Sequence, residues 1–198
     1  MIKIIGPHER KKFLEDEKNF LIDVTSQSTT WTKVFSPFFL GPCKLYGPYG
    51  AFNVENAWQY AKVYKDQVDE NGDPTDAYWD FAYRGWGKKR AERYPKGKGA
   101  VPEYSLWDGE KLGYVDAKRR IYVPLYEKAV YDSGYFESLV EFVRELEQEG
   151  YQVGFFDFDG FDNHAQNMSF DDVLNSNRRL GHAMVLANMI AKYLKEVP

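Results

Sequence analysis

Residues 52–64 constrain the fold most, because their sequence is apolar on nearly every side of a helix. The stretch reads Phe-Asn-Val-Glu-Asn-Ala-Trp-Gln-Tyr-Ala-Lys-Val-Tyr, and the spacing of its apolar residues predicts a single helix. At about 3.6 residues per turn, Glu55, Gln59 and Lys62 share one narrow stripe of that helix. A helix that is apolar nearly all round is normally buried, so it is expected to carry an acid, an amide and an amine into the interior.

The polar stripe has two interpretations. Buried charges are costly unless they are paired, and groups with perturbed pKa values gather at functional sites, so the stripe predicts a catalytic pocket with Glu55 and Lys62. The alternative is an exposed helix with an ordinary Glu55–Gln59 pair and a solvated Lys62, because such spacings are common on helix surfaces. The sequence leaves both interpretations open.

The length of 198 residues fits one domain over residues 1–198, with residues 1–30 as an N-terminal extension packed on it. Aromatic residues make up 17% of the chain, which predicts aromatic-lined pockets. The net charge of -4 gives no general attraction to nucleic acid or anionic membranes. Cys43 is the only cysteine, which excludes an intrachain disulfide and fits a reducing cytoplasm. Neither a signal peptide nor a membrane span is expected, so the predicted location is cytoplasmic.

The hydrophobic periodicity predicts a mostly α, multihelical domain with a few short β-strands. The strands are expected near the N-terminus and over residues 151–158, where short apolar runs are bounded by turn residues. Pro124 should kink or divide the helix in which it lies. The expected helices cover residues 7–19, 53–64, 76–83, 114–131, 135–148 and 178–193.

Two further segments carry charges that suit a phosphate. Residues 88–99 are basic and interleaved with aromatic residues, a pattern that can grip phosphate and stack a base, although a solvated basic loop is the alternative. Arg178 and Arg179 are expected in the first turn of the last helix, where backbone N–H groups also favour an anion. His182 in the same helix is interpreted as a structural histidine.

The aspartates at positions 157, 159 and 162 suggest a calcium loop, but no glutamate closes the loop at the required distance. The three histidines and the cysteine are scattered, without the spacing of a zinc site. We therefore expect neither a metal nor a cofactor.

Several segments resemble the NADAR domain family, which has the YbiA-like fold. The turn at residues 35–38, Phe-Ser-Pro-Phe, is similar to the Phe-Ser-Asn-Phe opening of that family. Glu55, Gln59 and Lys62 match its Glu-His-x-x-Gln-Ala-x-Lys-Phe segment in register. The basic turn after Trp86, the segment 116–130, the loop 157–160 and the Arg-Leu-Gly of the last helix follow in the family's order.

The chain also departs from the family at several places, and the loop between the Gly-Trp turn and Trp107 is longer than in the family. Asn56 replaces the histidine after the glutamate, and Pro37 replaces an asparagine. The tryptophan of the family's late loop is missing, and Arg178 stands where its helix has an asparagine. These changes affect the expected substrate more than the expected fold.

The resemblance implies an N-glycosidase that hydrolyses a ribose N-glycosidic bond. It implies substrates of the ADP-ribose or ribosylamine-phosphate type, including ADP-ribosylated guanine, with nucleic acid as a carrier of the modified base. A carboxylate would stabilise positive charge at the anomeric carbon, and a lysine could trap the opened sugar as a Schiff base. The implied catalytic residues are Glu55, Lys62 and Asp159. The implied substrate-binding residues are Phe35, Ser36, Phe38, Trp58, Gln59, Trp86, Arg90, Asp157, Arg178 and Arg179.

Two other functions compete with the N-glycosidase. A non-catalytic module that binds ADP-ribose or another nucleotide would keep the pocket without turnover, and the missing histidine and tryptophan favour it. A structural or interaction protein would instead use Glu55 and Lys62 as a buried ion pair with no cleft beside them. The partner expected for the first two is a small-molecule nucleotide, with no membrane involved. The sequence carries no signal of oligomeric state.

Overall fold

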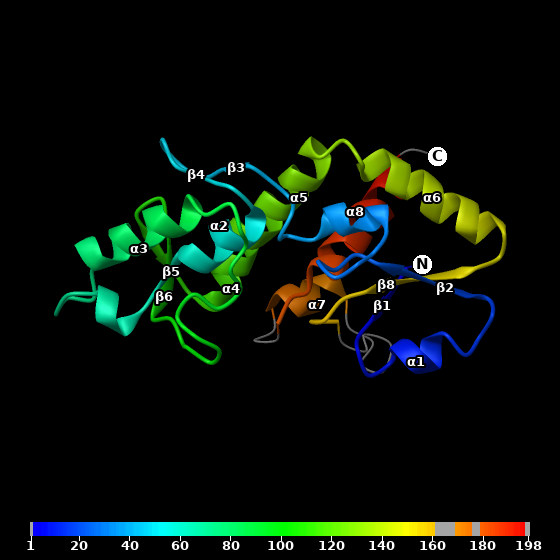
Figure 1. Ribbon diagram of the computed structural model, residues 1–198, viewed down its shortest axis with the longest axis horizontal. Helices are drawn as coiled ribbons and strands as arrows, with labels where there is room; N and C mark the ends of the chain where they lie inside the picture. The colour runs from blue at the N-terminus through cyan, green and yellow to red at the C-terminus, as the bar shows by residue number, and fades with distance from the viewer. Residues whose placement is uncertain (1, 161–168, 176–178, 197–198) are drawn as a thin grey trace. The chain divides into compact units, whose positions relative to one another are not determined.

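The computed structural model describes residues 2–160, 169–175 and 179–196 (Figure 1). About 45% of the chain is helical and 15% is in strands, so helices dominate a mixed architecture with three small sheets. These proportions confirm the expected secondary-structure content, which is mostly helix with a few short strands. The YbiA-like arrangement of these elements stays a prediction.

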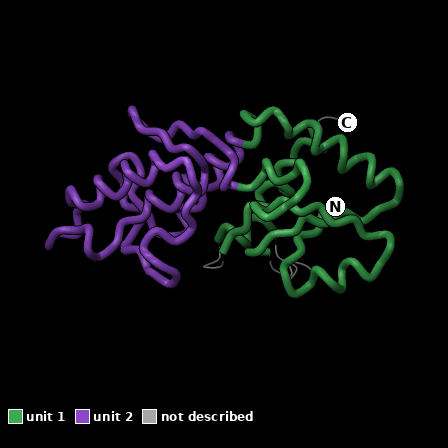
Figure 2. Tube along the Cα trace, in the orientation of Figure 1, with its two compact units in different colours: residues 1–36, 130–198 green, residues 37–129 purple. Residues whose placement is uncertain are grey.

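The chain divides into two compact units (Figure 2). Unit 1 contains Met1–Ser36 and Val130–Pro198, and unit 2 contains Pro37–Ala129. The boundary therefore falls once before Pro37 and once inside a helix, α5 (Val123–Asp132). The assignment of the whole chain to one domain stays a prediction.

Unit 1 contains a three-stranded parallel sheet in the order β1 (Lys3–Ile5), β8 (Gln152–Phe156), β2 (Asn19–Asp23). Both strand predictions, near the N-terminus and over residues 151–158, are confirmed. The first 30 residues are more than an extension packed on a domain, because they supply the two strands that flank β8. The central strand is buried, as is typical of a parallel sheet with both faces covered.

Helices cover this sheet on the two sides. Successive residues of β8 point to opposite faces, so Gly154 and Phe156 share one face. That face meets α1 (Arg10–Phe13), where Phe13 packs on Gly154 and the Arg10 guanidinium lies over the Phe156 ring. The sheet also packs against α6 (Phe136–Gln148) and α8 (His182–Glu196), and α7 (Phe170–Asn175) contacts α8.

Two helix predictions in unit 1 are wrong in their bounds. The helix expected over residues 7–19 is the single turn α1, because the residues after Phe13 are mostly charged and exposed and provide no apolar face to bury. The last helix begins at His182 instead of residue 178, and the preceding Gly181 lies tightly against the Asp157 carboxylate. The short helix α7 was not predicted.

Unit 2 combines a helical pair with two small antiparallel sheets. Its helices α2 (Val54–Tyr60) and α3 (Asp76–Trp86) pack together, and short 3-10 turns occur at Lys65–Gln67 here and at Trp31–Phe35 in unit 1. One sheet has the order β5 (Lys62–Val63), β6 (Tyr104–Trp107), β7 (Glu110–Leu112), and the other pairs β3 (Cys43–Lys44) with β4 (Gly50–Ala51). The β6–β7 hairpin turns at Asp108 and Gly109, both with positive φ, as Asp-Gly turns require.

The prediction of one helix through residue 64 is wrong. The helix ends at Tyr60, and the chain continues directly into β5. The Ala61 carbonyl accepts a hydrogen bond from the Leu106 N–H at 2.7 Å, so pairing with β6 replaces the next helical turn. Lys62 therefore lies in a strand.

The segment predicted as one helix over residues 114–131 contains a different interruption from the one expected. It consists of α4 (Tyr114–Ala117), a π-helical turn (Lys118–Tyr122) and α5. Pro124 is the second residue of α5, and its missing N–H removes one helical hydrogen bond to the preceding turn. The chain stays helical through Pro124, and the interruption is the π turn that directly precedes α5.

Among the described helices, none has both the length and the apolar character that crossing a membrane requires.

The close packing of α2 on α3 generates a stability prediction. A Cβ added to Gly85 would lie 1.9 Å from the Tyr60 ring, so Gly85→Ala should lower the free energy of unfolding by about 1–3 kcal/mol despite the better helix propensity of alanine. Asp80→Ala on the exposed side of α3 is the control and should change it by less than about 0.5 kcal/mol. Urea unfolding of both variants measures this, and equal stability of the two would contradict the packing.

Candidate active site in unit 2

The first turn of α2 is fixed by three contacts. Asn53 caps the helix, because its side chain accepts a hydrogen bond from the Asn56 N–H at 2.8 Å. The Val54 N–H donates to the Leu40 carbonyl and the Glu55 N–H donates to the Pro37 carbonyl, both at 2.9 Å. Every residue of α2 is buried, which confirms the expectation that this helix lies in the interior.

The predicted acid, amide and amine form one hydrogen-bonded relay. The Gln59 Nε2 donates to Glu55 Oε1 at 2.9 Å, and the Lys62 Nζ donates to Gln59 Oε1 at 2.7 Å. The amide orientation follows from its neighbours, since a carboxylate accepts hydrogen bonds and an amine with protons donates them. Although Lys62 lies in β5, its side chain completes the relay.

Burial lowers the pKa of the Lys62 amine to about 8, although the charge of Glu55 acts in the opposite direction. The Nζ also lies 4.7 Å from the centroid of the Trp58 ring, a cation–π contact that holds the amine in place. With this pKa, on the order of a tenth of the amine is neutral at pH 7. Lys62 can therefore act as a base or a nucleophile.

A second buried lysine lies near the relay and was not predicted. Lys118 is 1% exposed in the π-helical turn that packs against α2, and its Nζ lies 4.7 Å from the Tyr114 ring centroid. Burial lowers the pKa of Lys118, and the charge of Arg119 lowers it further. Tyr114 in turn lies near Trp58, with ring centroids 6.4 Å apart. The sequence signal was a lysine on the apolar stripe of a helical segment, and π turns are frequent at functional sites.

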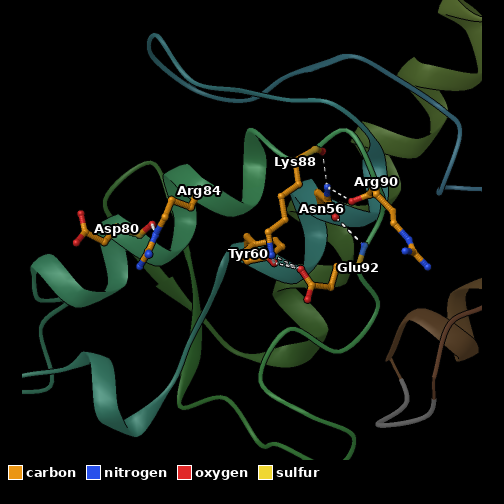
Figure 3. A network of polar contacts seen from close by, with 7 residues as sticks. All are labelled: Asn56, Tyr60, Asp80, Arg84, Lys88, Arg90 and Glu92. Atoms are coloured by element: carbon orange, nitrogen blue, oxygen red, sulfur yellow. Dashed lines mark hydrogen bonds and ion pairs between the residues drawn. The ribbon is translucent and has the colours of Figure 1, made fainter.

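Asn56 anchors the basic loop at residues 88–92 to α2 (Figure 3). Its Nδ2 donates to the carbonyls of Lys88 at 2.8 Å and Arg90 at 3.1 Å, and its Oδ1 accepts from the Glu92 N–H at 2.9 Å. The residue is fully buried. Asn56 is thus a positioning residue. No local pattern could reveal this, because its partners are backbone atoms more than 30 residues away.

Two lysines of the basic segment form ion pairs within unit 2. The Lys88 amine forms an ion pair with Glu92 and donates to the Tyr60 hydroxyl at 3.0 Å, and the Tyr60 hydroxyl donates to the same carboxylate. Lys96 forms an ion pair with Asp66. Arg90, the residue of this segment predicted to bind phosphate, is exposed, and its side chain points away from this network (Figure 3).

The other aromatic residues predicted in unit 2 differ in their exposure. Phe38 is half-buried. Trp86 is 2% exposed and packs between the rings of Tyr46, Tyr49 and Tyr83. The prediction that Trp86 stacks a base is wrong, because these neighbouring rings and its burial leave no face for a ligand.

The remaining predicted residues belong to unit 1. Phe35 and Ser36 are buried there, and Arg178 lies outside the described residues. Arg179 precedes α8 instead of lying in its first turn, and its guanidinium is 3.6 Å from the Asp159 carboxylate, so the predicted helix-terminus anion site is not formed by this residue. A pocket shared by the relay and the loop at residues 157–160 stays a prediction.

Asp157 is buried in an ion pair with His182. Its Oδ2 lies 3.0 Å from His182 Nδ1 and accepts from the Ala183 N–H, and its Oδ1 accepts from the Asp159 N–H. His182 Nε2 lies 2.8 Å from the Val24 carbonyl, so both ring nitrogens face acceptors, which requires an imidazolium. We interpret Asp157 as a structural anion and not as a substrate ligand, and the structural role expected for His182 agrees with these contacts.

Residues 8–186 match the model of a family of unknown function, DUF6939. The chain belongs to this family. Comparisons with curated proteins and with solved structures gave no match. The DUF6939 match includes the relay in unit 2 and the Asp157–His182 pair in unit 1, so the family region covers parts of both units.

In the described part of this DUF6939 chain, no three His, Cys, Asp or Glu side chains are grouped to hold a metal ion. Asp162, the third residue of the calcium pattern, lies outside the described residues. The relay itself supplies acid–base and nucleophilic groups.

The Asp157–His182 pair predicts how stability depends on pH. Burial alone would raise the pKa of Asp157, but the charge and hydrogen bond of His182 and two backbone N–H groups lower it to about 2. A depressed carboxyl pKa stabilises the fold above its unfolded value of 3.8, and this contribution is lost as the pH falls toward 2.

We expect the free energy of unfolding to fall by about 2 kcal/mol more in the native protein than in Asp157→Asn between pH 4 and pH 2. Urea unfolding at several pH values gives the free energy of unfolding of each protein. Subtracting the two values at each pH cancels the contribution of the other carboxyl groups, which both proteins share. Parallel pH profiles for the two proteins would show that Asp157 carries no such stabilisation.

Proposed function

We propose that this DUF6939 chain is a hydrolase that cleaves the N-glycosidic bond of a ribose phosphate derivative. The observation that carries the proposal is the buried Glu55–Gln59–Lys62 relay with its lowered lysine pKa. The resemblance of the same three residues to the NADAR glutamate segment supports the substrate class. Suitable substrates are ADP-ribose or ribosylamine-phosphate compounds and ADP-ribosylated guanine, free or carried by a nucleic acid in the cytoplasm.

The proposed reaction uses the two ends of the relay for different tasks. The neutral Lys62 amine takes a proton from the attacking water, whose oxygen bonds to the anomeric carbon. The bond from that carbon to the leaving nitrogen breaks, and the resulting ammonium returns the proton to this nitrogen. Positive charge develops at the sugar and at Lys62, and the negative charge of Glu55 stabilises both through the low-dielectric interior.

The groups around the relay suit binding of such a substrate. Trp58 positions the lysine through its ring. The base is proposed to contact the half-buried Phe38. Asn56 holds the backbone of Arg90, and the exposed guanidinium of Arg90 can bind phosphate. Asp159, predicted as a third catalytic residue, belongs to unit 1 and is not needed for this mechanism.

A nucleotide-binding module without turnover is the second candidate. The observation in its favour is that Asn56 stands where the resembling family has a histidine and uses its amide to anchor backbone atoms. In that case the pocket would bind the substrate without cleaving it.

The test is turnover of a panel of ribosyl N-glycosides, including ADP-ribosylated guanine in DNA, read by mass spectrometry. We expect Lys62→Met and Glu55→Gln to lower kcat about a hundredfold or more while the protein stays folded. Lys65→Met is the matched control, because Lys65 is exposed three residues further along the chain, and it should keep full activity. Binding without cleavage would support the module, and full activity of both relay variants would rule out the relay as the catalytic site.

The pH profile gives an independent check of the lysine's role. Because the neutral amine is the active form, kcat should rise with pH through about 8 and then level off. Borohydride treatment during turnover distinguishes the two possible uses of Lys62. A reduced sugar adduct on Lys62 would show Schiff-base chemistry, and its absence during turnover agrees with a proton-transfer role.

A further inference from the structure

A cavity of about 490 Å³ lies in unit 1, separate from the residues of the relay. It is lined by the length of β2, by the following loop at residues 27–32 and by side chains of α1, α6 and the end of β8. Ligands of parallel α/β sheets bind outside the carboxyl ends of the strands, and this cavity includes the carboxyl ends of β2 and β8. Its volume lies in the range of pockets for small molecules.

The outer edge of β2 offers a backbone donor and acceptor to this cavity. The strand lies at one side of the sheet, and the Gln152 N–H donates to the Lys18 carbonyl. Because alternate residues of a strand turn their backbone groups to opposite sides, Leu21 and Asp23 turn theirs away from β8. Thr32 donates to the Asp23 carbonyl at 2.7 Å, whereas no described residue bonds to the Leu21 N–H or C=O.

A chain of hydroxyl groups orders the loop at residues 28–32, which also lines the cavity. Since Thr32 donates to the Asp23 carbonyl, its oxygen accepts from Thr30 at 2.6 Å, and Thr30 accepts from Ser28 at 3.0 Å. Every hydroxyl proton in this chain has an acceptor. The loop is thus pre-organised, and it presents Trp31, which is 44% exposed, to the cavity.

Two opposite charges stand at the carboxyl end of β2. The Asp23 Oδ1 accepts from the Thr25 N–H and hydroxyl, which orients the carboxylate and leaves Oδ2 without a partner among the described residues. The exposed Arg10 guanidinium stacks on Phe156, the residue paired with Asp23 in the sheet. No ion pair of Arg10 occurs in the described part of the chain.

We infer that this cavity binds a ribonucleoside 5′-monophosphate. A carboxylate at the end of a parallel strand is suited to accept hydrogen bonds from ribose hydroxyls, and Asp23 occupies that place. Arg10 binds the phosphate in the bidentate way that guanidinium groups favour. The base stacks on Trp31 and pairs its polar edge with the open Leu21 backbone groups. Base, ribose and phosphate thus follow β2 from Leu21 to Asp23 and on to Arg10.

The test is calorimetric titration of the full chain with AMP, GMP, CMP, UMP, adenosine, dAMP and inorganic phosphate. At least one ribonucleotide should bind saturably and more tightly than its deoxy or dephosphorylated form. Arg10→Gln should weaken nucleotide binding at least tenfold and leave adenosine binding unchanged. Asp23→Asn should reduce the preference for AMP over dAMP, and Trp31→Leu should weaken binding of all nucleotides.

Matched controls come from the same unit. Lys11→Gln removes an exposed positive charge beside Arg10, and Tyr131→Leu removes an exposed ring, so both should bind as the native protein does. Circular dichroism confirms that the surface variants fold. The inference is overturned if no nucleotide binds at millimolar concentration, if Arg10→Gln and Lys11→Gln behave alike, or if a free aromatic amino acid binds in preference to every nucleotide. Lys62→Met should retain this binding, because the inference does not rest on the proposed hydrolase activity.

Discussion

The candidate active site depends on the two hydrogen bonds of the buried Gln59 amide, one to the Glu55 carboxylate and one from the Lys62 amine. The amide joins Glu55 to Lys62 without a direct ion pair, so the lysine loses hydration and gains only part of the compensation that an adjacent anion would give. The lowered pKa of Lys62 is the consequence. The rest of unit 2 maintains this arrangement, since the capped helix α2 fixes the acid and the amide while β5 fixes the amine.

The local pattern of the sequence was sufficient to predict the burial of α2 and the meeting of Glu55, Gln59 and Lys62. It was not sufficient to predict that the helix stops at Tyr60, because the competing hydrogen bond comes from Leu106, more than 40 residues away. The three parallel strands were visible as short apolar runs. Their order, with the late strand between two early ones, depends on contacts that no local pattern contains.

The same distinction between local and long-range contacts applies to the functional residues. Lys118 and Asn56 escaped prediction because their roles come from a π turn and from backbone carbonyls distant in sequence. The aspartates after β8 suggested a ligand site, yet the Asp157 carboxylate is paired with His182 of α8. A polar residue that follows an apolar strand thus signals a special environment, and only its partners reveal whether that environment is structural or chemical.

The proposed chemistry depends on a Lys62 amine that is partly neutral near physiological pH. The most direct measurement is an NMR titration of the protein with ¹³C-labelled lysine side chains, with the Lys62 resonance assigned by its absence in Lys62→Met. We expect a titration midpoint near pH 8 for Lys62, well below the value of about 10.4 for an unperturbed lysine. A Lys62 midpoint above pH 10 would contradict this expectation, because the amine would then be fully charged and unable to act as a base.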